Sequence, residues 1–251
     1  MTALAIYVGL LLARLGAFVA VMPFVGTRAP RAVKAGFVIV LAAFYISAAP
    51  PPLPNGPAPG VELESVRYAV ALLREMVIGA GMGFAFGLFL LPARVAGEFV
   101  TVQVGLNVAP LPGPTGTDSA GAITTLFETM AAFVFLVVDG HHVVLSLLHA
   151  SFSAYPLGGA AVPEAAPMVA GLSTAYEMGL LLAAPLGVCM FLLSVTLAIM
   201  SRAAPQLNIY SVGFTLQVAV VLFGGLFLTP ELVRTLTAIA ARLGVMLPDL
   251  T

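Results

Sequence analysis

Two ionisable residues lie inside long apolar stretches of this sequence, where an isolated charge is costly. Arg14 falls within residues 3–22, and Glu128 falls in the middle of residues 119–138. An ionised side chain at the centre of a bilayer costs about 2.5 to 3.5 kcal/mol, so each needs a partner or water. Such charges can form a proton or ion pathway, or they can fix the packing of helices. Because no acidic cluster accompanies them, we favour the structural role.

Other charges near the apolar stretches are expected to form short-range pairs. Arg94 and Glu98 are four residues apart, which places them side by side on a helix. Arg74 and Glu75 are adjacent and are expected to neutralise each other in part. Nothing at these spacings resembles the paired carboxylates of a catalytic site.

Three histidines and one cysteine are the candidate metal ligands with nitrogen or sulfur as the ligand atom. His141, His142 and His149 could share a helix face, since seven or eight residues make about two turns. No Glu-x-x-His or His-Glu-x-x-His pattern accompanies them. We therefore expect no metal site, and we assign His141 a structural role at the membrane interface. Cys189 lies in an apolar run and is expected to be a small packing residue.

The sequence also lacks the short motifs that carry enzymatic chemistry. It contains no Gly-x-Ser-x-Gly elbow and no phosphate-binding Gly-x-x-x-x-Gly-Lys loop. We predict that the protein is not an enzyme and has no catalytic residues and no cofactor.

The elements that must position these residues are indicated by composition. The 251 residues are 61% hydrophobic and 8% charged, with a mean hydropathy of +1.09. An ordinary soluble domain is roughly 45 to 50% apolar and about 25% charged. The net charge of −1 offers no basic surplus for a nucleic-acid partner. This composition predicts an integral membrane protein.

Apolar residues gather into six stretches that we expect to be membrane helices. We predict an all-α, polytopic membrane protein in which a single domain occupies residues 1–251 and several helices are short or broken. The first stretch has no preceding Lys or Arg, so we expect it to be retained rather than cleaved as a signal peptide. The stretches are residues 3–22, 36–49, 76–91, 119–138, 178–200 and 209–228.

Length and proline content suggest irregular helices. A helix of 16 residues over 76–91 covers only about 24 Å, less than a hydrocarbon core of roughly 30 Å. Pro185 lies inside the fifth stretch and Pro205 just before the sixth, where proline bends or stops a helix. The proline-rich residues 50–60 predict an exposed linker. The basic Arg28, Arg31 and Lys34 place their loop in the cytoplasm.

Small residues recur every four positions in two of the stretches. Such faces let helices approach closely in a membrane, so we expect packing within the chain or against partner subunits. The residues concerned are Gly79, Gly83 and Gly87 in one stretch, and Gly171, Ala175, Gly179, Ala183 and Gly187 in the other.

Four segments carry a more specific signal, and they occur in a fixed order. They read ARLGAFVAVMPFVGTRAPRAVKAGF, AGEFVTVQVGL, FVFLVVDGHHVVLSLL and RAAPQLNIYSVGFTL. Over nearly the whole chain this set resembles the FliR/SctT family of flagellar and injectisome export proteins. The residues that carry the resemblance are Arg14 with Pro23, Pro30 with Arg31 and Lys34, Gly97 with Glu98 and Phe99, Gln103 with Gly105, Gly140 with His141, and Pro205, Gln206, Leu207 and Asn208.

The resemblance implies a subunit of the type III secretion export gate. Its implied partners are sibling small membrane subunits (FliP-like and FliQ-like), an FlhB-like switch protein, membrane lipid and the unfolded proteins that are exported, with no nucleic acid. The implied location is the bacterial inner membrane at the flagellar basal body, in a hetero-oligomeric assembly. Gln103-x-Gly105 and Gly213-Phe214 favour the flagellar over the injectisome system.

The loop after Gly105 is the candidate gate. Its prolines and glycines cannot continue either flanking helix, and irregular backbone at membrane depth must line a cavity or be covered by protein. The corresponding family segment is a plug, although relatives often carry an Asp that this chain lacks. An ordinary solvent loop is the alternative. The loop residues are Asn107, Val108, Ala109, Pro110, Leu111, Pro112, Gly113, Pro114, Thr115 and Gly116.

Two other functions remain open at this stage. A secondary transporter of a small solute also uses broken helices and buried charges, although such folds usually show related halves and no internal repeat is evident here. A purely structural membrane anchor is the third possibility. Ion-driven solute uptake by the purified chain would support the transporter.

Overall fold

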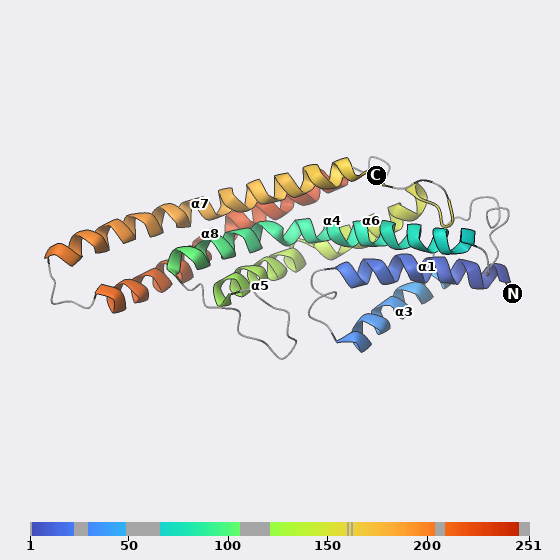
Figure 1. The fold of residues 1–251 in the computed structure, drawn as a ribbon, viewed down its shortest axis with the longest axis horizontal. Coiled ribbons are helices and arrows are strands. Elements are labelled where there is room, and N and C mark those ends of the chain that lie inside the picture. Colours follow the sequence, from blue (N-terminus) through green and yellow to red (C-terminus); the bar gives the residue numbers. More distant parts are fainter. Residues whose placement is uncertain are drawn as a thin grey trace. The chain divides into compact units, whose positions relative to one another are not determined.

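The computed structural model describes residues 2–22, 30–48, 66–105, 121–159, 161, 163–203 and 209–245, and all regular structure in these ranges is helical. Figure 1 shows the order of the helices along the chain. They are α1 (Thr2–Val21), α3 (Arg31–Ser47), α4 (Val66–Val104), α5 (Ala122–Val137), α6 (Gly140–Ala154), α7 (Ala165–Ala203) and α8 (Ile209–Val245).

The predicted class, an all-α polytopic membrane protein, is confirmed. Within the described residues, four helices are long and apolar enough to cross a membrane, namely α1, α4, α7 and α8, and α5 with α6 could form a fifth, broken span. The short helices are α3, α5 and α6, with 17, 16 and 15 residues. Our expectation of a short helix over residues 76–91 was wrong, because α4 extends for 39 residues. Polar residues at both ends of that stretch simply continue the helix.

Helix α6 was missing from the sequence prediction. Its 15 residues include three histidines and three serines, which lower the local hydropathy below that of the six stretches. It begins directly after Asp139, which adopts a φ of 57°. Asp is one of the few residues with a side chain that visits this left-handed region readily. The chain can therefore bend between α5 and α6 without a long loop.

Prolines lie inside three of the long helices without ending them. Pro92, Pro185 and Pro230 are internal to α4, α7 and α8. Pro185 was expected to bend or stop its helix, and the structure shows that α7 does not stop there. Pro205 lies outside the described residues.

The chain divides into two compact units, which are described separately. The first contains Met1–Leu88, His141–Gly171 and Leu243–Thr251, and the second contains Phe89–Gly140 and Leu172–Arg242. Helices α4 and α7 each contribute one part to either unit.

In the first unit, α1 and the first part of α4 run in the same direction with their backbones close together (Figure 1). Gly79 faces the backbone carbonyl of Arg14. A Cβ built on Gly83 would lie 2.7 Å from the carbonyl oxygen of Phe18. No residue larger than glycine fits these two positions without a shift of the helices.

Aromatic side chains join α3 and α6 in the same unit. Tyr45 is buried, with its ring centroid 4.8 Å from that of Phe152 and 6.2 Å from that of His149, on which it stacks. His149 thus makes an aromatic contact rather than sharing a site with the other two histidines.

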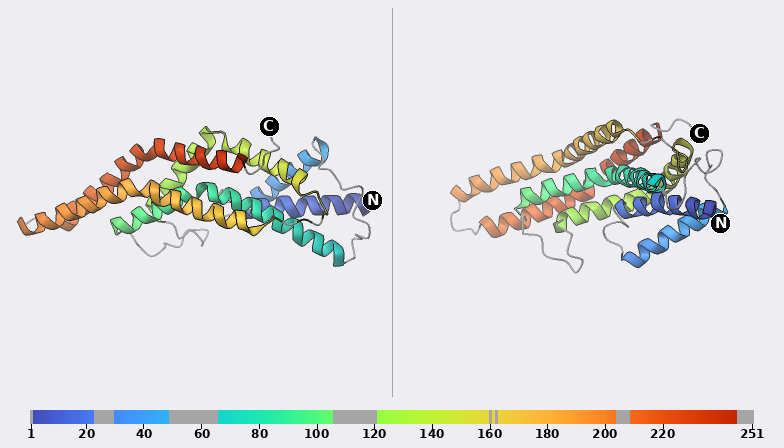
Figure 2. Two further views of the ribbon diagram at one scale, coloured as in Figure 1. Left: turned by 90° about the horizontal axis from the view of Figure 1, so that it is seen from above. Right: turned by 45° about the vertical axis from the view of Figure 1, so that its right-hand side comes forward.

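In the second unit, α7 and α8 form an antiparallel pair, as both views in Figure 2 illustrate. Gly213 on α8 lies against Leu197 on α7, and Gly224 on α8 lies against Leu186 on α7. Residue numbers therefore fall along α7 as they rise along α8. The second part of α4 packs on α7, where a Cβ on Gly179 would lie 2.7 Å from Cβ of Val95.

The small residues singled out from the sequence occupy unequal positions. Gly187 faces the ring of Phe99, and the side chain of Ala183 is buried. Gly87 differs, because among the described residues nothing lies within 4 Å of a Cβ built there. Close approach within the chain therefore involves several of these residues but not Gly87.

Large apolar surfaces remain uncovered on the C-terminal helices. In the apolar segments that could cross a membrane, only 28% of the residues of α7 and 22% of those of α8 are buried, compared with 50% for α4. Phe191, Phe223 and Phe227 are among the exposed side chains. These faces must contact lipid or other subunits, since exposing large apolar patches to water is unfavourable.

Gly83→Leu should destabilise the first unit, because the new side chain meets the backbone of α1. Overpacking of this kind costs about 1 to 3 kcal/mol. We expect a lower melting temperature in mild detergent and less protein in the membrane. Gly87→Leu is the matched control on the same helix and should be nearly neutral for packing within the chain, because nothing described lies within 4 Å of a Cβ built there. Equal behaviour of the two variants would show that the α1–α4 contact is not close.

Candidate functional site

The first unit contains a buried charge cluster that joins α1, α4 and the segment after α6. Arg14 and Glu75 have side chains with 0% exposure, and Nε of Arg14 donates to Oε2 of Glu75 at 2.7 Å. Nη2 of Arg14 lies 2.6 Å from the same carboxylate oxygen. The pairing is therefore bidentate on the arginine side, a geometry that fixes both side chains.

The remaining donors of Arg14 are satisfied by the end of α6. Nη1 donates to the carbonyl oxygen of Ser151 at 3.1 Å, and Nη2 donates to that of Tyr155 at 2.7 Å. The guanidinium carbon also lies 4.8 Å from the ring centroid of Phe152. Carbonyls at a helix C-terminus lack partners within the helix and carry partial negative charge. A cation held there stabilises the end of α6.

Glu75 and Arg74 hold the chain that follows α6. Oε1 of Glu75 accepts from the backbone N–H of Gly158 at 3.1 Å. Arg74 donates to the carbonyl oxygens of Gly159 and Ala161, and its Nη1 lies 3.5 Å from Oε1 of Glu75. The cluster thus ties residues 151–161 to α1 and α4.

Sequence reasoning identified Arg14 as a charge that needs a partner, but it did not identify Glu75 as that partner. It paired Glu75 with its neighbour Arg74, and the structure shows that this contact is the weaker one. A signal was present, because Glu75 directly precedes the apolar residues 76–91, on a predicted helix with a small-residue face. The acceptor carbonyls of Ser151 and Tyr155 could not have been found without α6.

The second unit brings together the two helix ends that flank residues 106–120. Oγ1 of Thr101 lies 3.1 Å from Oγ1 of Thr124, and both threonines are buried. A Cβ on Gly97 would lie 2.7 Å from Cα of Thr124, so the backbones of α4 and α5 touch there. Helix α4 ends at Val104, and the following Gly105 has a φ of +73°, which is typical of a C-terminal glycine. The sequence analysis had not singled out either threonine.

Three further charged residues from the sequence analysis lie in this unit. Nε of Arg94 lies 3.0 Å from Oε1 of Glu98, as their spacing on one helix predicts, and 3.8 Å from Oε1 of Glu128. The side chain of Glu128 is 17% exposed. The charge of Glu128 thus has Arg94 nearby. Gln103, another residue of the sequence analysis, is exposed near the end of α4.

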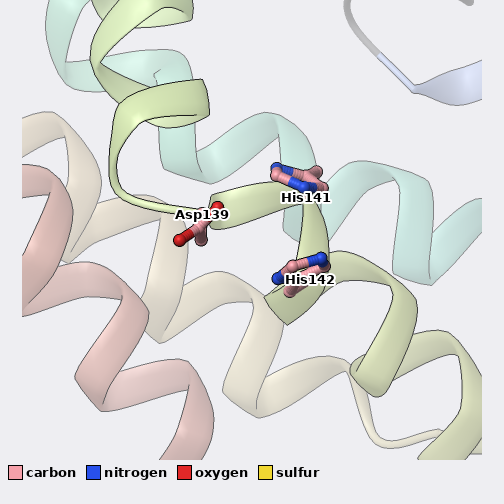
Figure 3. Close-up of side chains that lie close together, drawn as sticks. All are labelled: Asp139, His141 and His142. Atoms are coloured by element: carbon pink, nitrogen blue, oxygen red, sulfur yellow. The ribbon is translucent and has the colours of Figure 1, made fainter.

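The adjacent histidines lie at the start of α6, after the turn at Asp139, as Figure 3 shows. The ring centroids of His141 and His142 are 4.2 Å apart. All three side chains come from four consecutive residues at a surface turn, and such exposed groups commonly occur without any bound ion. We assign no chemistry to them.

Several predicted site residues lie outside the described part of the chain. These are the ten loop residues 107–116, together with Pro205, Gln206 and Asn208. Their roles stay predictions.

Comparisons with known proteins bear on nearly the whole chain. The family described as "Bacterial export proteins, family 1" matches residues 5–243. Flagellar biosynthetic protein FliR of Escherichia coli (strain K12) is 30% identical over 212 residues, which cover 83% of this chain and 78% of that protein. The protein of the same name from Bacillus subtilis (strain 168) is 27% identical, covering 82% and 80%.

A secretion protein outside the flagellar group also matches. Surface presentation of antigens protein SpaR of Shigella sonnei is 23% identical over 152 residues, which cover 61% of this chain and 59% of that protein. Its identity and coverage are lower than those of the two flagellar proteins.

Glu75→Leu should strongly destabilise the protein, because it leaves Arg14 buried without its carboxylate. Removing one partner of a buried ion pair costs about 3 to 5 kcal/mol. The double variant Arg14→Met with Glu75→Leu should recover much of this loss, although the carbonyls of Ser151 and Tyr155 then lack their donor. Glu98→Leu, in an exposed pair, is the control. Thermal melting in detergent measures all three, and a Glu75→Leu loss no greater than that of Glu98→Leu would contradict the assignment.

Proposed function

We propose that this chain, which belongs to the bacterial export proteins, family 1, is a non-enzymatic subunit of the type III export gate that serves flagellar protein export. The observation that carries the proposal is the match of the family over residues 5–243. The membrane helices and the buried ion pair of Arg14 and Glu75 agree with a structural role in a membrane channel. The two flagellar relatives favour the flagellar system.

The uncovered helix faces support a subunit that packs on partners. More than two thirds of the residues in the apolar segments of α7 and α8 are not buried in the single chain. We infer that sibling small membrane subunits of FliP-like and FliQ-like type cover part of these faces, and that an FlhB-like switch protein joins the assembly. The location is then the bacterial inner membrane at the flagellar basal body. Because α4 and α7 run through both units, we further propose that the chain acts as one domain.

The loop of residues 107–116 is the proposed gate. Its two ends are fixed by described residues, since Thr101 is hydrogen-bonded to Thr124 and Gly97 contacts the same threonine. A loop whose ends are held at one point can fill a channel without displacing the helices that carry it. The secondary transporter is not favoured, because the family match points to export proteins.

Co-purification in mild detergent tests the assembly. An affinity-tagged chain should bring down other small hydrophobic membrane subunits of the secretion system, and expressed alone it should aggregate or be degraded. A long-lived, monodisperse monomer that captures no subunit would contradict the proposal. Ion-driven solute uptake by the purified chain would instead support the transporter.

Deletion of residues 110–116 should leave assembly intact while making the membrane leaky to ions and small molecules. The reason is that the flanking helices are held by Thr101 and Thr124 and do not need the loop to pack. Deletion of residues 50–54, in the other proline-rich segment, is the control and should not increase leakage. Conductance of assembled complexes in planar bilayers measures both. Unchanged conductance after the first deletion would reduce this loop to a connector.

Thr101→Val should open the gate in part, because it removes the hydroxyl bonded to Thr124 while keeping the shape of the side chain. A lost hydrogen bond of this kind costs about 0.5 to 1.5 kcal/mol, so we expect brief openings rather than a permanent leak. Thr129→Val is the control, since among the described residues the hydroxyl of Thr129 donates to the carbonyl of Thr125 on its own helix and to no other helix. The same bilayer recordings distinguish the two variants, and equal opening frequencies would argue against the threonine clamp.

A further inference from the structure

The first unit contains a partly enclosed cavity of about 180 Å³ in addition to its charge cluster. Helix α1, the first part of α4, helix α6 and the start of α7 surround it, together with the chain between α6 and α7. None of the described residues that line it is charged. The larger apolar side chains in its wall are those of Phe18, Ile78, Phe86, Val144, Leu147 and Met168.

The wall of the cavity offers little to a polar occupant. Ser151 and Tyr155 are the polar residues among those that line it. The hydroxyl of Ser151 donates to the carbonyl oxygen of Leu148 at 2.7 Å, and the carbonyl oxygens of Ser151 and Tyr155 both accept from Arg14. A water molecule held in a cavity needs about two to four polar partners. The wall therefore favours an apolar occupant over water.

The volume of the cavity indicates the size of that occupant. In another protein, an engineered cavity of about 150 Å³ lined by Leu, Ile and Phe stays dry and binds benzene or xenon. At about 180 Å³, the cavity described here has room for one such ring but is too small for a lipid acyl chain. Phe18, Ile78 and Phe86 are buried, so this part of the wall is already packed in place. A preformed wall lowers the entropic cost of binding.

Met168 is the adjustable part of the wall. A Cβ built on Gly81 of α4 would lie 2.5 Å from Cε of Met168, so the end of this side chain lies against the glycine. Met168 is also partly exposed. Because methionine is unbranched and flexible, its side chain can move aside and then close over a ligand. We propose that this cavity is a binding site for one small apolar molecule, of the size and class of a single-ring aromatic hydrocarbon.

A molecule in this site would lie close to the ion pair that organises the first unit. Phe18 is four residues after Arg14 on α1, and Ile78 is three residues after Glu75 on α4, which is about one helical turn in each case. The ligand would therefore pack against the same helices that the ion pair joins. A ligand that binds only the folded protein stabilises it, and the stabilisation grows with ligand concentration.

The test uses the full chain, purified within its membrane assembly and reconstituted in nanodiscs, with fluorobenzene as the probe. Fluorine NMR separates probe bound to protein from probe dissolved in the bilayer, and empty nanodiscs supply the blank. We expect a saturable bound signal and a higher melting temperature with the probe present. A wild-type protein without saturable binding would overturn the proposal, whether the cavity closes or a lipid tail or a partner's side chain fills it.

Ala85→Leu is the variant that fills the cavity, because Ala85 lines it from α4. It should abolish the saturable signal. Gly87→Leu is the matched control, since it places the same side chain two residues further along the same helix, where nothing described lies within 4 Å of a built Cβ. It should bind the probe like the wild type. Undiminished binding by Ala85→Leu, or an equal loss in both variants, would refute the location.

Phenol tests the chemical class of the ligand on the wild-type protein, so this comparison decides even if Ala85→Leu does not fold. Phenol has the same ring as fluorobenzene but carries a hydroxyl that the wall cannot satisfy. At equal concentrations in the bilayer, it should bind at least about tenfold more weakly, because a buried hydroxyl without a partner is unfavourable. Equal binding of phenol and fluorobenzene would show a polar site and would overturn the assignment to an apolar ligand.

Discussion

The first unit depends on the ion pair between Arg14 and Glu75. Neither residue can remain ionised in an apolar environment alone. The pairing energy offsets the cost of desolvation only when additional hydrogen bonds satisfy the remaining donors and acceptors. The carbonyls at the end of α6 and the N–H of Gly158 meet that requirement. One pair of charges therefore fixes the mutual positions of α1, α4 and α6. The glycines at positions 79 and 83 make this possible by letting α1 and α4 approach closely enough for the side chains to meet.

The second unit is held together in a different way. Its helices meet through small residues and apolar side chains, and its polar contacts are a threonine pair and partly exposed ion pairs. Much of the surface of α7 and α8 remains uncovered. This contrast suits a subunit with one part organised by internal polar bonds and another part that completes its packing on neighbouring proteins and lipid.

The sequence was sufficient for the fold class, for most of the helices and for the Arg94–Glu98 pair, because these follow from local hydropathy and from the helical repeat. It was insufficient where a feature depends on residues far apart in the chain. Arg14 was recognisable as a charge in need of a partner, but Glu75 is 61 residues away and the Tyr155 carbonyl is 141 residues away. Helix α6 was missed because its histidines and serines dilute its apolar character. The length of α4 was misjudged because hydropathy marks the apolar part of a helix rather than its hydrogen-bonded ends.

The separation of these partners along the chain has a consequence for biosynthesis. A ribosome adds roughly 5 to 20 residues per second. Arg14 thus emerges about 3 to 12 s before Glu75 and about 7 to 28 s before the Tyr155 carbonyl, given the separations of 61 and 141 residues. During that interval the guanidinium has none of its final partners, and lipid alone does not solvate it. The nascent first helix therefore acquires these partners only after α4 and then α6 have been synthesised, so translation sets a lower limit on the time in which this unit matures.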